Sequence, residues 1–138
     1  MRLMVLFAML APAAVFAAQP AADPIEGTWR GASQCQYRPS ARRDEIAVYH
    51  ISRAAQPHTY RMVMNKVIGG EEQNMGDLVG TFDDASHTLS ATSYDRQNRP
   101  GHWSFVLNGD QLSGRLVTSD GKLFRLITLK RAGSQAHH

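Results

Sequence analysis

Two arginine-rich stretches of the 138-residue chain carry the side chains best suited to binding an anion. One spans residues 37–43 and the other spans residues 95–101. The planar guanidinium of arginine pairs bidentately with carboxylate or phosphate groups. The predicted anion-binding residues are Tyr37, Arg38, Arg42, Arg43, Arg96 and Arg99. The alternative interpretation is that they are ordinary solvated loop charges.

Aromatic and methionine side chains form a second set that alternates with polar residues. They are Tyr60, Met62, Met64, Phe82, Trp103 and Phe105. If these side chains line a hollow interior, they predict a cavity for the apolar part of a small ligand. If they pack against one another, they form an ordinary core, because a small eight-stranded barrel is just wide enough for its own side chains.

No residue pattern predicts catalysis, a metal site or a cofactor site. The six histidines lack the H-x-x-x-H and H-E-x-x-H spacings of metal sites. The chain also has no G-x-S-x-G motif and no glycine-rich phosphate loop. Asp83 and Asp84 are adjacent, but neighbours on an extended chain point to opposite faces, and Ala85-Ser86 favours a turn there. We therefore expect a non-enzymatic protein that needs no cofactor.

Cys35 is the only cysteine, so the chain cannot form an internal disulfide. Two interpretations remain open for its thiol. It is either a small buried apolar side chain or one half of a disulfide between two chains.

Eight runs rich in β-branched, aromatic and methionine residues are separated by turn-forming residues, which predicts eight strands. The runs are Ile25–Gln36, Glu45–Arg53, Thr59–Ile68, Met75–Phe82, Thr88–Tyr94, His102–Leu107, Gln111–Thr118 and Lys122–Arg131. Alternation of an apolar and a polar face is clearest in Thr59–Ile68, His102–Leu107 and Gln111–Thr118. The last run has apolar residues on both faces, which indicates either a bulge or burial on both sides.

The connections between the runs are too short for the crossovers that parallel strands need. Asn108-Gly109 and Ser119-Asp120-Gly121 are typical of tight hairpins. The sequence therefore predicts an all-β, eight-stranded, antiparallel up-and-down meander. Closure into a small barrel would remove the unpaired edges of the sheet. The longer connections, including residues 69–74, would then gather at one mouth.

Ile25-Glu26-Gly27-Thr28-Trp29 opens the first predicted strand. A Gly-x-Trp at this place resembles the calycin group, which includes the lipocalins and the avidin-like barrels. The resemblance implies a structural role for Gly27 and Trp29. It also implies that a cation near the end of the last strand, Arg125 or Arg131, packs over the Trp29 ring.

The first seventeen residues resemble a secretory signal peptide. Arg2 is followed by an apolar run, and small residues end at Ala17, where cleavage is expected. We thus expect a signal peptide at residues 1–17, a disordered lead at 18–24, one barrel domain at 25–131 and a flexible tail at 132–138. The product would be periplasmic or secreted, without a membrane anchor.

Charge adds little to this interpretation. Fifteen basic and twelve acidic residues give a net charge of +3, which falls to about +2 without Arg2. Such a balance lacks the clustered basic surface of nucleic-acid-binding proteins. Two functions remain: a binding module for a small apolar or anionic ligand, or a protein-interaction module such as an inhibitor of an exported hydrolase. The expected partner is accordingly a small molecule or an envelope protein.

Overall fold

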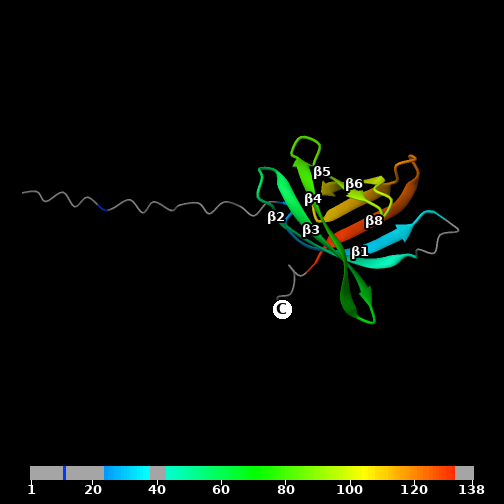
Figure 1. Ribbon diagram of the computed structural model, residues 1–138. Helices are drawn as coiled ribbons and strands as arrows, with labels where there is room; N and C mark the ends of the chain where they lie inside the picture. Colours follow the sequence, from blue (N-terminus) through cyan, green and yellow to red (C-terminus); the bar gives the residue numbers. More distant parts are fainter. Residues whose placement is uncertain (1–10, 12–23, 38–42, 133–138) are drawn as a thin grey trace, which may run out of the picture.

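The computed structural model describes residues 11, 24–37 and 43–132, and it is an all-β structure of eight strands (Figure 1). The strands are β1 (Gly27–Cys35), β2 (Glu45–Arg53), β3 (Thr59–Ile68), β4 (Glu71–Asp83), β5 (Thr88–Tyr94), β6 (Pro100–Asn108), β7 (Gln111–Val117) and β8 (Leu123–Arg131). No helix that is long and apolar enough to span a membrane occurs among these residues.

Each strand pairs antiparallel with the next, and β8 pairs with β1 to close the barrel. The closing register runs from Trp29 opposite Arg131 to Cys35 opposite Arg125. Gly31 permits this closure, because a Cβ there would lie 1.9 Å from the backbone oxygen of Thr128. The predicted eight-stranded meander and its closure are confirmed.

Alternation along the strands separates a buried interior from the outer surface. In β3 the side chains of Tyr60, Met62 and Met64 are buried, and Arg61 between them is exposed. Side chains from all strands meet in a single core, which includes Trp29, Tyr49, Met62, Leu89, Phe105, Leu112, Ile127 and Leu129. Burial of these apolar groups is the main source of stability for such a fold.

Two local features of the sheet bear on the predictions for residues 69–74 and for the last strand. Residues 69–74 are not a long loop, since β4 begins at Glu71 and the turn is only Gly69-Gly70, both at positive φ. The prediction of a loop here is wrong, because the polar first half of β4 is a strand that is exposed on both faces. In β8, a register shift opposite Leu116 and Val117 confirms the bulge interpretation.

The predicted signal peptide, the lead and the tail fall almost wholly outside the described residues. The exceptions are Ala11, Pro24 and Ala132. All other described residues belong to the single barrel.

Candidate functional site

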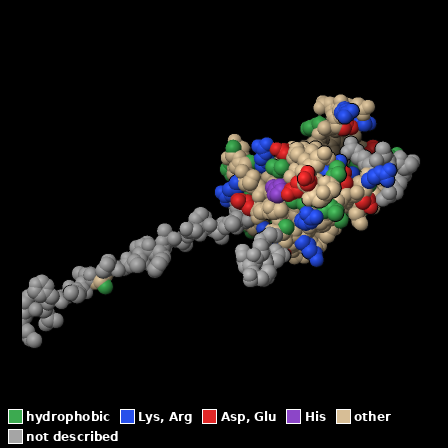
Figure 2. Space-filling model, turned by 90° about the horizontal axis from the view of Figure 1, so that it is seen from below, with side chains coloured by type: hydrophobic (Ala, Val, Ile, Leu, Met, Phe, Trp, Pro, Cys, Tyr) green, Lys and Arg blue, Asp and Glu red, His purple; other side chains and the backbone are tan. Residues whose placement is uncertain are grey.

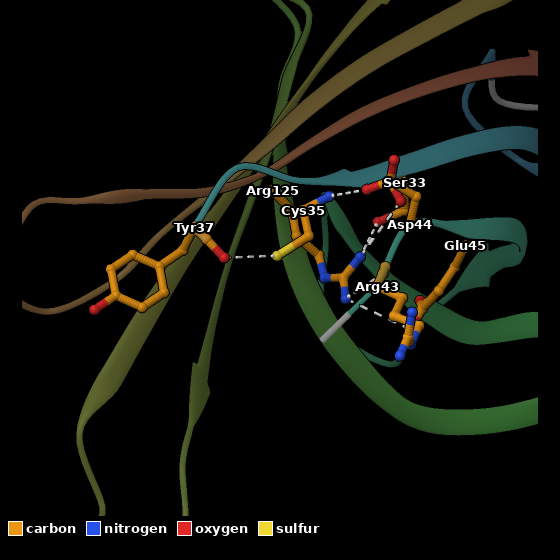
Figure 3. Close-up of polar contacts among 7 residues, drawn as sticks. All are labelled: Ser33, Cys35, Tyr37, Arg43, Asp44, Glu45 and Arg125. Atoms are coloured by element: carbon orange, nitrogen blue, oxygen red, sulfur yellow. Dashed lines mark hydrogen bonds and ion pairs between the residues drawn. The ribbon is translucent and has the colours of Figure 1, made fainter. Parts of the chain in front are cut away.

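Arg125 organises the end of the barrel where the predicted mouth lies. Its side chain is buried, and Nη1 donates to Ser33 Oγ at 3.1 Å and to the Ser33 carbonyl at 3.4 Å (Figure 3). Nη2 donates to the Arg43 carbonyl at 3.2 Å and lies 3.5 Å from Glu45 Oε1. The guanidinium is thus engaged by four protein oxygens and serves to join β1, β2 and β8.

Cys35 lies beside Arg125 in the paired strands and is 2% exposed. Its thiol donates to the Tyr37 carbonyl at 3.4 Å, and its backbone N–H donates to Asp44 Oδ1 at 2.8 Å. A disulfide between two chains would require this end of β1 to open. The buried-thiol interpretation is therefore the one that the geometry favours.

The predicted anion-binding residues do not form one described site. Arg38 and Arg42 lie outside the described residues, and the Tyr37 ring points away from Arg125 (Figure 3). That ring stacks on Phe124, with ring centroids 6.4 Å apart. Arg43 and Arg96 are exposed.

Arg99 is already paired, because its Nε donates to Asp95 Oδ2 at 2.8 Å. Asp95 also accepts hydrogen bonds from the backbone of Gln97 and Arg99. This loop therefore carries an internally neutralised pair, and binding of an anion at this mouth stays a prediction.

The expectation that came with the Gly-x-Trp resemblance is confirmed at the other end of the barrel. The guanidinium carbon of Arg131, not that of Arg125, lies 4.3 Å from the centroid of the Trp29 ring. Arg131 also donates to the carbonyls of Glu26, at 2.7 Å, and of Pro24. Trp29 Nε1 donates to the Ile25 carbonyl at 3.0 Å. Gly27 adopts a φ of 130°, which glycine tolerates without strain.

Five of the six residues predicted to line a cavity belong to the buried core. They are Tyr60, Met62, Met64, Phe82 and Phe105, each at most 6% exposed. Tyr60 packs edge-on against Phe82, with centroids 6.1 Å apart, and Phe105 packs edge-on against Tyr49 at 6.0 Å. These contacts favour a core role for the set. They do not outline an enclosed space for a ligand.

Trp103, the sixth residue, differs because it is only partly buried. It stacks parallel to Phe105 at 6.2 Å, and its Nε1 donates to Ser93 Oγ at 2.8 Å. It lies beside an open depression of about 510 Å³ on the outer surface of β4, β5 and β6. The other lining residues are Val79, Thr81, Ser90, Ala91, Thr92, His102 and Ser104.

This depression adjoins the shortest junction of the barrel. The β4–β5 ladder has three residue pairs and ends where Thr81 faces Ser90, whereas β5 and β6 share seven pairs. Beyond that point β4 departs with β3, and the turn end of this hairpin projects from the barrel (Figure 1). The stretch from Glu71 to Asp77 is exposed.

The departure leaves backbone groups of two strands without a ladder partner among the described residues. The Phe82 N–H bonds the His58 carbonyl, and the Leu107 N–H bonds the His87 carbonyl. The backbone N–H and C=O groups of successive residues point to alternate sides of a strand. Those of Val79 and Asp77 therefore point from β4 toward β5. By the same alternation, the backbone N–H and C=O groups of Thr92 and Tyr94 point from β5 toward β4. Two open edges therefore face one another.

A chain of hydrogen bonds crosses the outer face of β1 to β4. Thr28 Oγ1 lies 3.0 Å from His50 Nδ1, and His50 Nε2 lies 2.6 Å from Glu72 Oε1. Asn65 Nδ2 also donates to Glu72 Oε1, at 3.1 Å. These bonds from Asn65, and then from His50, lower the pKa of Glu72 below its usual range. These hydrogen bonds link the projecting β3–β4 hairpin to β1 and β2.

The sequence pattern did not point to the residues around the β4–β5 opening. Thr81, Ser90, Thr92 and Ser104 occupy the polar face of alternating strands, where hydroxyl side chains are common. The one available signal was the polar composition at the start of β4, which marks a strand that lacks a covering neighbour.

The chain matches no protein-family model, and a search of curated proteins finds no significant relative. Any functional conclusion therefore rests on the sequence and the structure themselves.

Proposed function

We propose that this protein is an exported, non-enzymatic binding module that recognises a partner protein through its outer surface, at the β4–β5 opening. The observation that carries the proposal is the three-pair ladder between these strands, which leaves two open edges beside a depression. An open edge can accept an extended segment of another chain by β-strand addition. Inhibition of an exported hydrolase is one form that such an interaction takes.

The dimensions of the opening suit an extended segment. A strand residue occupies about 160 Å³ in a packed sheet, from its rise, the strand spacing and the sheet spacing. The depression of about 510 Å³ therefore has room for roughly three residues. Main-chain groups at Val79 and Thr92 would supply hydrogen bonds on the two sides.

The arrangement of side chains predicts which segments fit. Thr81, Thr92 and His102 line the outer side, whereas Leu78 and Trp103 pack against the core on the inner side. Successive side chains of an added strand point to opposite faces. The best partner segment would thus carry an apolar residue facing Trp103, flanked by uncharged polar residues that face the hydroxyl groups.

The surface charge supports recognition of a protein over that of a nucleic acid. Basic and acidic side chains are interspersed on the face seen from below the barrel, and small apolar patches lie between them (Figure 2). Nucleic-acid recognition needs a continuous basic surface to neutralise phosphates. The buried core also supports contacts made outside the barrel and not within it.

The experiment is site-specific photo-crosslinking in envelope extract, with a photoreactive residue at Ser90 beside the opening or at Thr128 on the exposed face of β8. We expect a protein partner to be captured from position 90 only. Thr92→Pro removes one edge N–H, and we expect it to abolish capture, because the deleted group faces away from the β5–β6 ladder. Thr92→Val keeps the N–H and should retain capture. Equal capture at both positions, or capture by the proline variant, would contradict the proposal.

A further inference from the structure

A second cavity lies at the opposite end of the barrel from Arg125. Its volume is about 340 Å³, and its lining residues are Pro24, Phe82, Asp84, His87, Leu107 and Gly109. They come from the segment before β1, from the ends of β4 and β6, and from the turns that follow these two strands. This cavity is distinct from the depression over β4 to β6, with which it shares no lining residue.

The walls of the cavity are mainly apolar and are held by the fold. Phe82 and Leu107 are 6% and 7% exposed and belong to the core. Pro24 is fixed from the other side, because its carbonyl accepts a hydrogen bond from Arg131 Nη2. An apolar cavity built on rigid elements is preformed, so a ligand would pay little to order it.

The backbone around the cavity is also fixed in an uncommon conformation. His58 and His87 both have positive φ, at 59° and 54°, which is unusual for residues other than glycine. Their carbonyls accept hydrogen bonds from the Phe82 N–H at 2.8 Å and the Leu107 N–H at 2.9 Å. The two histidine turns are thereby attached to the two apolar walls.

Asp84 supplies the only acidic side chain among the lining residues. Its Oδ2 lies 3.5 Å from His58 Nδ1, and both side chains are largely exposed at the rim of the cavity. No lysine or arginine lines the cavity. The combination of an apolar wall and one carboxylate complements a molecule with an apolar body and a positive end.

We infer that this cavity is a binding site for a small organic cation, such as an aromatic or short-chain alkyl ammonium. The apolar body would lie against Phe82 and Leu107, and the ammonium group would face Asp84. With about 30 Å³ for each water-sized group, the cavity accommodates about eleven of them, which suits a ligand of roughly ten non-hydrogen atoms. This site is independent of the proposed protein-binding function.

The test compares three probes of similar shape and different charge: phenethylammonium, 3-phenylpropionate and 2-phenylethanol. Each is titrated into the mature protein while amide chemical shifts are recorded. We expect phenethylammonium to bind saturably, with a Kd below about 1 mM, and to shift the amides of His87, Leu107 and Gly109. The anion should bind at least tenfold more weakly. Equal responses to all three probes, or shifts located elsewhere, would overturn the inference.

Variants separate the carboxylate from the general environment. Asp84→Asn should weaken phenethylammonium binding at least tenfold. Asp83→Asn is the matched control, because Asp83 Oδ1 accepts the Ala85 N–H within its own turn and asparagine can keep this bond. The control should bind like the unmodified protein. An unchanged Kd in Asp84→Asn, with the fold intact by its amide spectrum, would show that the carboxylate does not recognise the ligand.

Discussion

Arg131 covers the Trp29 ring at 4.3 Å and at the same time donates to two carbonyls that precede β1. One side chain of the last strand therefore fixes both the first core aromatic residue and the entry of the chain into the barrel. The arrangement is a cation–π contact reinforced by charge-assisted hydrogen bonds. This contact lies at the end of the barrel opposite Arg125.

Replacing Arg131 by methionine should lower the free energy of unfolding by about 2 kcal/mol, because the cation–π contact and the carbonyl bonds are lost together. Urea unfolding followed by tryptophan fluorescence measures this change. Lys130→Met is the control, since the neighbouring Lys130 is exposed. A loss below about 0.5 kcal/mol for Arg131→Met would show that the contact is dispensable.

Arg125→Met should cost about 3 kcal/mol, because it leaves Glu45 and the backbone oxygens of Ser33 and Arg43 without their shared donor. Glu45→Gln should cost about 1 kcal/mol, since Arg125 keeps its bonds to three other oxygens. Thermal and urea unfolding of both variants and of the double variant give the coupling between them. Equal losses in the two single variants would contradict this division.

Most of the barrel can be predicted from the sequence, because side-chain alternation and tight turns are local features. Closure follows because it leaves no unpaired edge of the sheet. Met62 and Phe105 were assigned to the apolar face by period-two spacing alone, and both are buried. Trp29 and its covering arginine followed from the Gly-x-Trp resemblance, although the choice between Arg125 and Arg131 required the register of β1 against β8.

The candidate sites were harder to predict, for physical reasons. Where β4 leaves β5 depends on the curvature of the whole sheet, and nothing local to Thr81 or Ser90 encodes it. Asp84 and Leu107 come together only because the β4–β5 turn and the end of β6 meet at one end of a closed barrel. Side-chain alternation predicts which face a residue occupies, but it does not predict whether that face is filled or hollow.

Glu72→Gln should make the free energy of unfolding depend less on pH in the acidic range. Hydrogen bonds from Asn65 and His50 hold the pKa of Glu72 below its usual value of 4.5. A lowered folded-state pKa adds stability above the unfolded-state value, and this stability is lost as the pH falls through the folded-state value. The unmodified protein should therefore exceed the variant in stability near neutral pH, and the gap should close in acid.

Urea unfolding at a series of pH values below neutral follows this gap. Glu71→Gln removes one charge from the same hairpin and serves as the control for a general charge effect. A gap between the unmodified protein and Glu72→Gln that stays constant into acid would mean that the bonds to Glu72 contribute nothing that depends on its ionisation.

Tyr49 should make the barrel sensitive to alkali. Burial raises the pKa of its hydroxyl well above the usual value of 10.0, and nearby Arg125 offsets only part of that rise. A raised folded-state pKa leaves stability intact below pH 10.0 and removes it as the pH climbs beyond that value, because the unfolded chain then releases the proton more readily. In a titration of tyrosinate absorbance, we expect Tyr49 to ionise only as the barrel unfolds. Tyr49→Phe should lower the amplitude of that late step by one hydroxyl, whereas Tyr94→Phe, at an exposed position, should leave its amplitude unchanged. An unchanged amplitude in Tyr49→Phe would assign the late step to other groups.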